Sequence, residues 1–447
     1  MKVVFSTAAL CLLALSSCFT SRKGPDVSAL SATTDGEHAQ KETEPVNDKK
    51  TEPKGAFRVA LEDGRHWLIT PAGERFLSLG VVHISAVAQQ GKVDLFGKRF
   101  GCDWRKVSEE AFDNLRNWGF NTAGYGAPRP LREMLPFMAD VFLAKNCHFL
   151  TNDRFSYPDV FDPQYQREIE EKIKKMCLAN RNNDNLIGYY WTDTPHWDLD
   201  IARRKRGTDW VSAIRHLDAG APGKKRYVVF LKQKYDGDTT KFNRVYEMEI
   251  LAFDELLSEP FDGLDLESVR SDDMEFLAMI AREYYRVTGE ANKRYDPEHL
   301  IFGERYLATD CPDEVLVEAL PYVDVLSIQP LGSRFRQDRF ERLHKLTGKP
   351  IMLCDHQCSF ATPEYPRTMW KQLESEEAVG IAYGNYLEDA FARPYVIGYH
   401  RCQYIDRFAP SHGVLKQGLI REDATPYVEL VEYVRKANSD LTARFLK

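Results

Sequence analysis

Two acidic residues stand where two apolar runs of the chain end. The first run lies in Leu186–Trp197 (LIGYYWTDTPHW) and ends at Asp193; the second lies in Gly348–Phe360 (GKPIMLCDHQCSF) and ends at Asp355. A buried strand that stops at a carboxylate aims that group into the space beyond its end, which in a parallel α/β barrel is the mouth of the active site. Two carboxylates facing each other there can hydrolyse a glycosidic bond, because one donates a proton to the leaving oxygen while the other acts on the opposite face of the sugar. We therefore predict that Asp193 is the acid and Asp355 the nucleophile or base. A structural role for Asp193, accepting N–H groups of a loop, is the alternative.

Several histidines follow predicted strands and are candidates to line the same pocket. A single histidine near a strand end is more often structural, whereas several at one rim favour contact with a ligand. The histidines predicted to bind substrate are His83 after the first strand, His148 after the third, His356 after the seventh and His400 after the eighth. His196 is a further candidate, as a proton donor.

Tryptophans in the same region are candidate platforms for sugar rings. Trp191 and Trp197 flank the first acidic residue, but side chains alternate along a strand, so about half of the aromatic residues there belong to the core. For the same reason His356 and its neighbour Asp355 face one pocket only if a turn begins between them.

The elements that position these residues alternate between strand-length apolar runs and amphipathic segments. Eight strands separated by helices favour a closed (β/α)8 barrel of the TIM type over an open sheet. Two short alternating runs in Phe57–Gly80 predict an N-terminal β-hairpin that caps it. The predicted strands are Leu77–Ile84, Asn121–Tyr125, Asp140–Lys145, Leu186–Trp191, Leu300–Tyr306, Val323–Ile328, Pro350–Cys354 and Tyr395–His400. The long interval 196–298 predicts a helical insertion between the fourth and fifth strands; a separate helical subdomain is the alternative.

The N-terminus is typical of an exported lipoprotein. A short basic start, an apolar run from Val3 to Leu15 and the sequence Leu-Ser-Ser-Cys ending at Cys18 predict a signal peptide over 1–17 and a lipidated Cys18. Residues 18–55 are polar and predict a disordered tether, which leaves 56–447 for the barrel. We expect anchoring in the bacterial cell envelope, at the outer membrane, with the lipid as the sole contact with membrane.

Composition excludes some classes of partner. The formal net charge is −7, with 28% charged residues, so nothing favours nucleic acid. The cysteines after Cys18 lack paired C-x-x-C spacing, so no zinc site is predicted, and no cofactor is implied. A single disulfide remains open.

Several segments together resemble the catalytic barrel of the family-50 β-agarases, which are glycoside hydrolases of clan A. GRHWLITPAGERFLSLGV resembles the opening of that group, and NWGFNTAGYG its second strand. HLIFGERY and YVDVLSIQPLG resemble its fifth and sixth strands, and PYVIGYHRCQYIDR its eighth. The resemblance runs over about 57–440 and implies a TIM barrel that hydrolyses O-glycosidic bonds of a polysaccharide or oligosaccharide, with Arg305 of the Gly-x-Arg pattern holding a carboxylate ionised.

The sequence departs from that family where the chemistry is carried out. Pro195 stands where the resemblance places the acid/base glutamate, and Asp355 replaces the nucleophilic glutamate. Shortening that group by one methylene widens the gap between the carboxyls, and a separation of about 6.5–9.5 Å is typical of inverting enzymes, against about 5–5.5 Å in retaining ones. Gln329 and Arg401 also stand at positions where the family has other residues, and both are predicted to contact substrate. The alternatives are a catalytically inactive, glycan-binding surface lipoprotein and, with less support, a metal-dependent hydrolase.

Overall fold

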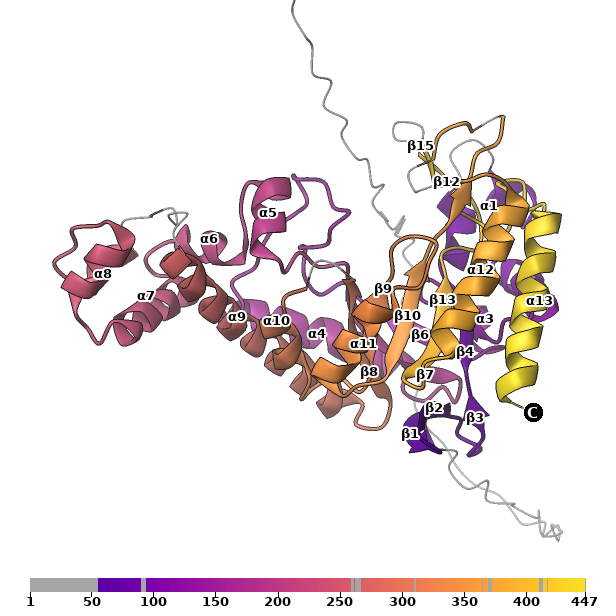
Figure 1. The fold of residues 1–447 in the computed structure, drawn as a ribbon, viewed down its shortest axis with the longest axis horizontal. Coiled ribbons are helices and arrows are strands. Elements are labelled where there is room, and N and C mark those ends of the chain that lie inside the picture. The colour runs from indigo at the N-terminus through magenta and orange to yellow at the C-terminus, as the bar shows by residue number, and fades with distance from the viewer. Residues whose placement is uncertain are drawn as a thin grey trace, which may run out of the picture.

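Eight parallel strands close into a barrel, as the sequence predicts (Figure 1). The computed structural model describes residues 55–89, 94–258, 261, 267–308, 311–363, 365–368, 372–409, 413–415 and 417–446. Around the barrel the strand order is β4-β5-β6-β7-β8-β9-β10-β13. The strands are β4 (Ser78–Val81), β5 (Thr122–Ala123), β6 (Phe137–Asp140), β7 (Leu186–Asp193), β8 (Leu300–Leu307), β9 (Leu326–Gln329), β10 (Ile351–His356) and β13 (Val396–Arg401). Their near-continuous apolar sequences fit strands that are covered on both faces.

Helices cover the outside of the barrel in the expected alternation. Each amphipathic helix buries one apolar face against the strands, which is how a parallel sheet is shielded from water. The helices are α2 (Trp104–Asn117), α3 (Arg129–Arg132), α4 (Pro163–Asn180), α9 (Glu267–Tyr295), α10 (Asp313–Ala319), α11 (Gln337–Thr347), α12 (Glu376–Phe391) and α13 (Val428–Phe445). None of the helices within the described ranges is both long enough and apolar enough to span a membrane.

A small antiparallel sheet closes the end of the barrel opposite the mouth. It contains β1 (Arg58–Glu62), β2 (Arg65–Ile69) and β3 (Arg75–Phe76), so the predicted hairpin has gained a third strand. Phe57 and Leu68 pack into the same apolar cluster as the residues that fill the barrel.

The interval between β7 and β8 forms the predicted helical insertion. Helices α6, α7 and α8 extend sideways from the barrel, and the long helix α9 leads back to it (Figure 1). The insertion comprises α5 (Leu199–Arg206), α6 (Trp210–Arg215), α7 (Pro222–Lys234) and α8 (Thr239–Tyr246).

The third barrel strand lies earlier in the chain than predicted. The sequence pattern favours Asp140–Lys145, whereas the strand is β6 (Phe137–Asp140). The apolar run from Leu135 to Ala144 is long enough for either choice, and only pairing with β7 selects its first half. As a result Asp140 closes the strand instead of opening it.

The predictions for the N-terminus and for a disulfide have different outcomes. The signal peptide, the lipidated Cys18 and the tether lie outside the described residues. The cysteines that the structure describes are all free thiols, so none of them forms the disulfide that the sequence left open.

Candidate active site

A β-bulge at Gly303 turns Arg305 into the barrel. Ile301 packs outward and Phe302 inward, so strict alternation would send residue 305 out to the helices. Gly303 has φ +67°, and the pairing with β7 shifts by one residue there. Such a bulge reverses the facing of all later residues. Glu304 therefore faces α9, and Arg305 faces the barrel interior.

The two acidic residues reach the interior by similar irregularities. The register between β7 and β8 shifts again before Asp193. The register between β10 and β13 shifts between Leu353 and His356, where Asp355 has a φ of 59°. A non-glycine residue in this left-handed region costs about 1–2 kcal/mol, and such strain is concentrated at functional sites.

A continuous series of contacts joins the two carboxylates across the barrel mouth. Arg305 donates from Nε to Asp193 Oδ1 at 3.1 Å, and its guanidinium carbon lies 3.7 Å from the centre of the Tyr125 ring. The Tyr125 hydroxyl lies 3.0 Å from His83 Nε2, which is 3.9 Å from Asp355 Oδ1. The carboxylates at the ends of the fourth and seventh barrel strands thus share one polar centre.

Burial and nearby charges shift the pKa values of Asp193 and His83 in opposite directions. Burial raises the pKa of Asp193 to about 6, with Asp355 also raising it and Arg305 opposing the change. Burial lowers the pKa of His83 well below its usual value, and the nearby Arg407 and Arg305 lower it further. Asp193 can therefore carry a proton close to neutral pH.

The centre is largely closed off by protein, and His83 is its most open member. Asp193 and Asp355 are 6% and 4% exposed, whereas the His83 side chain is 26% exposed. Asp355 Oδ1 is buried without a hydrogen-bond partner, so this oxygen is available to a ligand.

A group able to hold a metal ion overlaps this centre. The ligand atoms of His83, Asp355 and Cys402 lie within 4.8 Å of one another, the one such group among the residues that the structure describes. The Cys402 thiol also accepts a hydrogen bond from Gln417 Nε2 at 3.0 Å. Sequence spacing gave no sign of this group, because its members are far apart in the chain.

Two further residues of the mouth were missed or only partly assigned from sequence. Asp140, at the end of β6, accepts a hydrogen bond from the Gly126 N–H at 3.4 Å, and its charge acts on both Asp193 and Arg305. The shifted strand prediction concealed it. Tyr125 is the last residue of the predicted second strand but was given no role, and Arg305 lies over its ring.

Four of the predicted substrate-binding residues lie outside the barrel wall. Trp191 donates to Asn292 of α9 at 3.0 Å, and Trp197 donates to Glu304 at 2.7 Å. The other two pack against α12. His356 stacks on Tyr386 at 4.0 Å between ring centres, and the Arg401 guanidinium lies 5.8 Å from the Tyr383 ring. These four side chains contact the helices around the barrel, and the polar centre does not include them.

His400 lies inside the barrel but below the mouth. Its Nε2 is 2.9 Å from Ser78 Oγ, near the start of β4. Gly80 makes room for the ring, since a Cβ there would lie 2.6 Å from His400 Cδ2. Burial lowers the pKa of His400 to about 3, so this imidazole is a neutral core residue. Gln329, by contrast, ends β9 at the mouth, and its buried Oε1 has no hydrogen-bond partner.

His148 and His196 lie together in the loops that follow β6 and β7. Their rings are 4.6 Å apart. Burial, with His148 and the cations Arg206 and Lys205, lowers the pKa of His196 to about 3. A neutral imidazole is a poor proton donor, which weakens the prediction that His196 donates a proton.

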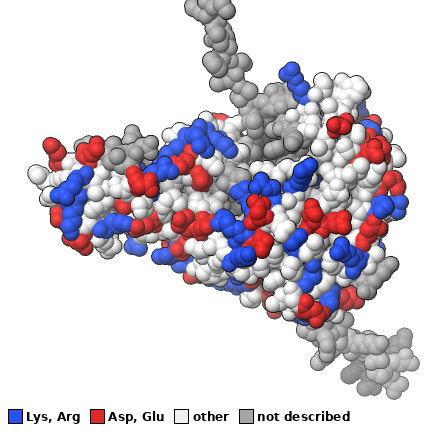
Figure 2. All heavy atoms as spheres, in the orientation of Figure 1, with Lys and Arg blue, Asp and Glu red and all other residues white. Residues whose placement is uncertain are grey.

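The basic stretch in α5 anchors these loops. Lysine and arginine side chains gather on the surface over α5 (Figure 2). Arg206 donates to the backbone carbonyls of Leu150 and His148, at 2.7 and 2.6 Å, and Arg203 pairs with Asp209 at 2.5 Å. The basic stretch is thus structural in part.

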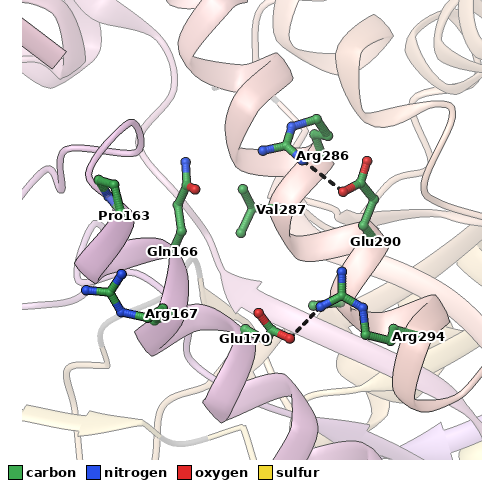
Figure 3. A pocket seen from close by; sticks show the side chains of 9 residues that line it. Pro163, Gln166, Arg167, Glu170, Arg286, Val287, Glu290 and Arg294 are labelled. Carbon is green, nitrogen blue, oxygen red and sulfur yellow. Dashed lines mark hydrogen bonds and ion pairs between the residues drawn. The ribbon is translucent and has the colours of Figure 1, made fainter. Parts of the chain in front are cut away.

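A cavity of about 260 Å³ between α4 and α9 lies away from this centre (Figure 3). Four of its charged side chains form two pairs, Arg286 with Glu290 at 2.8 Å and Arg294 with Glu170 at 2.5 Å. A second cavity of about 260 Å³ lies beside the mouth, lined by Pro330–Ser333, Gln357, Cys358 and Leu373.

Known structures share this architecture. A protein named PfGH50B aligns with a TM-score of 0.75 at 20% identity, over 90% of this chain and 68% of its own. An exo-beta-agarase aligns with a TM-score of 0.76 at 18% identity, over 89% of this chain and 66% of its own. The chain has a family-50 agarase-like fold.

Sequence comparison also finds agarases. Beta-agarase B of Vibrio sp. (strain JT0107) is 23% identical over 356 residues, which cover 76% of this chain and 36% of the agarase. Beta-agarase A of the same organism is 21% identical over 396 residues, covering 80% and 38%. The chain therefore spans little more than a third of the length of these curated relatives. No family model matches it.

Proposed function

We propose that this protein is an agarase-like glycoside hydrolase that cleaves O-glycosidic bonds of a polysaccharide or oligosaccharide. Asp193 acts as the general acid, and Asp355 acts as the base or nucleophile on the other side of the bond. The observation that carries the proposal is the series of contacts from Asp193 through Arg305, Tyr125 and His83 to Asp355.

The surroundings of the two carboxyls suit these roles. A general acid must hold a proton at the working pH, and burial raises the pKa of Asp193 to about 6. Arg305 fixes the position of that carboxyl and limits the rise of its pKa. Asp355 has an oxygen without a hydrogen-bond partner, which is free to accept a proton from water or to attack carbon. Its short side chain favours the wider gap, and thus inversion.

The relatives indicate which substrates to test first. Both curated relatives are named beta-agarases, so agar is the first candidate polymer, followed by other galactans and by plant glycans. The experiment is to incubate the purified protein with each glycan and to measure new reducing ends. Release of sugar from at least one of them is expected.

Two variants test the assignment, and a third is their matched control. Loss of a general acid or base typically lowers the rate by about 10²–10⁴-fold, so D193N and D355N should each fall by at least about 10²-fold. Glu304 is a buried carboxyl of the neighbouring strand on the opposite side of the wall, and E304Q should retain activity. If D355N cleaves as fast as the wild type, the role of Asp355 is wrong.

A glycan-binding protein without activity is the second candidate. It is favoured by Pro195, which forms a β-bridge with Cys147 where the family resemblance places the acid, and by the low exposure of both carboxylates. The same panel separates the two functions. A glycan that retards the protein in an affinity gel, with no reducing ends formed, would support binding alone.

For the cellular location we infer a lipid anchor at Cys18, with the folded part held at the bacterial envelope. The support is the apolar run from Val3 to Leu15 followed by Leu-Ser-Ser-Cys. Mass spectrometry of the N-terminal peptide should find a lipidated Cys18. C18A should move the protein from the membrane fraction to the soluble fraction, and an unchanged distribution would refute the anchor.

A further inference from the structure

Three potential metal ligands stand at the ends of three adjacent barrel strands. Asp355 lies in β10, Cys402 directly follows β13 and His83 follows β4, and these strands are neighbours in the order β10-β13-β4. All three side chains converge on one point, with their ligand atoms within 4.8 Å of one another. Because the three residues come from distant parts of the chain, only closure of the barrel brings them together.

Two of these ligands, His83 and Asp355, have a strained backbone conformation. His83 and Asp355 both have a φ of 59°, in the left-handed region. Each conformation costs about 1–2 kcal/mol for a non-glycine residue, and structures retain such strain where it orients functional groups. The distance from His83 Nε2 to Asp355 Oδ1 is already 3.9 Å. Ligands of tetrahedral zinc lie roughly 3.4–3.8 Å apart, as its bond lengths require, so small side-chain movements would complete the geometry.

The unpartnered oxygen of Asp355 points to a missing ligand. Asp355 is only 4% exposed, and its Oδ1 has no hydrogen-bond partner. A buried carboxylate oxygen without a partner is unfavourable by about 1–3 kcal/mol or more. A cation at this point would satisfy it.

The geometry points to a Zn²⁺ site formed by His83 Nε2, Asp355 Oδ1 and Cys402 Sγ, with a fourth position open towards the mouth. Imidazole, thiolate and carboxylate together suit zinc. On binding, the Cys402 thiol releases its proton to solvent, and the Tyr125 hydroxyl turns away from His83 Nε2. The carboxylate, thiolate and ion then sum to zero charge, which suits a buried position. The Gln417 amide, 3.0 Å from Cys402 Sγ, supports the thiolate as an outer partner.

This property goes beyond the proposed hydrolysis and opposes it. A carboxylate that coordinates zinc cannot attack or activate water at a sugar, so Zn²⁺ should inhibit any glycosidase activity at this site. Metal binding itself is measurable without substrate. Failure of the hydrolase proposal therefore leaves the zinc proposal standing, and the reverse also holds.

The test is titration of the chelator-treated full-length protein with ZnCl₂ by calorimetry and with CoCl₂ by absorption. We expect one equivalent of metal, with a thiolate-to-cobalt charge-transfer band. C402S should lose the band and weaken zinc binding at least about 10²-fold, since it removes a ligand outright where even an outer partner is worth 10–100-fold. C358S is the matched control, because Cys358 is also buried and free but lies outside the group; it should bind as the wild type does.

X-ray absorption of the zinc-loaded wild type gives a second measurement that does not depend on any variant. One sulfur neighbour together with nitrogen or oxygen neighbours is expected. Absence of stoichiometric binding, a zinc environment without sulfur, or a cobalt band that survives in C402S would each overturn the site.

Discussion

Replacing Glu304 by glutamine should remove part of the pH dependence of the free energy of unfolding. Glu304 is fully buried between β8 and the helices, where it accepts hydrogen bonds from Trp197 Nε1 and the Tyr285 hydroxyl, both at 2.7 Å. Burial raises its pKa from 4.5 to about 7, although the hydrogen bonds from Trp197, Tyr285 and Tyr284 oppose the rise. Its second oxygen, Oε1, has no partner. The folded state therefore favours the protonated carboxyl.

The sign and the size of the effect come from proton linkage. Between pH 4.5 and 7 the native protein keeps a proton at Glu304 that the unfolded chain has lost, so the free energy of unfolding falls as pH rises through this window. Below about pH 4.5 both states are protonated, and above about pH 7 both are ionised. The difference between the two pKa values corresponds to about 3 kcal/mol in all. E304Q keeps a neutral group that can accept the same hydrogen bonds, so it should not show this decline.

The assay is urea unfolding of both proteins at a series of pH values, followed by tryptophan fluorescence. All other titrating groups contribute equally to the two proteins, so the difference between their unfolding free energies isolates Glu304. The free energy of unfolding of E304Q, relative to that of the wild type, should rise by about 3 kcal/mol as the pH goes from 4.5 to 7. E133Q, at an exposed position, should behave as the wild type does throughout. A difference between wild type and E304Q that does not vary with pH would refute the buried, protonated state of Glu304.

Three other perturbations have expected outcomes of their own. G303A should lower the free energy of unfolding by about 2–4 kcal/mol in urea titrations, because φ is +67° and a Cβ would lie 2.7 Å from Val323 Cγ1. Gly64 has a φ of +74° but open space around it, so G64A should lower the free energy of unfolding by only about 1–2 kcal/mol. An equal loss in the two variants would contradict the clash with Val323. If Asp193 is the acid, kcat/KM measured by reducing ends should fall about tenfold per pH unit above about pH 6, where its raised pKa lies; a rate that stays flat to pH 8 would exclude it. Arg206 donates to the carbonyls of Cys147, His148 and Leu150, so R206A should raise the rate of amide hydrogen exchange over residues 147–150. An unchanged rate would show that these loops do not depend on Arg206.

The order of strands and helices is a local property of this sequence, and the sequence alone determined most of it. Apolar runs of strand length alternate with amphipathic segments, and that pattern predicts the barrel, its N-terminal cap and the insertion before β8. It also places Asp193 and Asp355 at strand ends. The third strand was misplaced at Asp140 because its apolar run is longer than one strand, and only pairing with β7 selects the part that is used.

The direction of each side chain was decided by the tertiary structure. Alternation with a period of two would face Arg305 outward; continued from the inward Cys354, it would also face Asp355 outward and His356 inward. Bulges settle both cases, since a register shift against the neighbouring strand and a positive φ at Gly303 and Asp355 reverse the facing of the next residues in the strand. A bulge depends on the partner strand, and a pattern read along one strand contains no information about that partner.

The same limit explains why the sequence misassigned Trp197 and gave no role to Cys402. An aromatic beside an acidic residue is typical of a sugar platform, but Trp197 is held by Glu304 and stacks on Trp210 at 4.6 Å, because the insertion folds back over it. Cys402 has no paired cysteine nearby in sequence, yet barrel closure places it beside His83 and Asp355. Local chemistry determined the elements of this protein, and contacts between residues hundreds of positions apart decided which side chains form its polar centre.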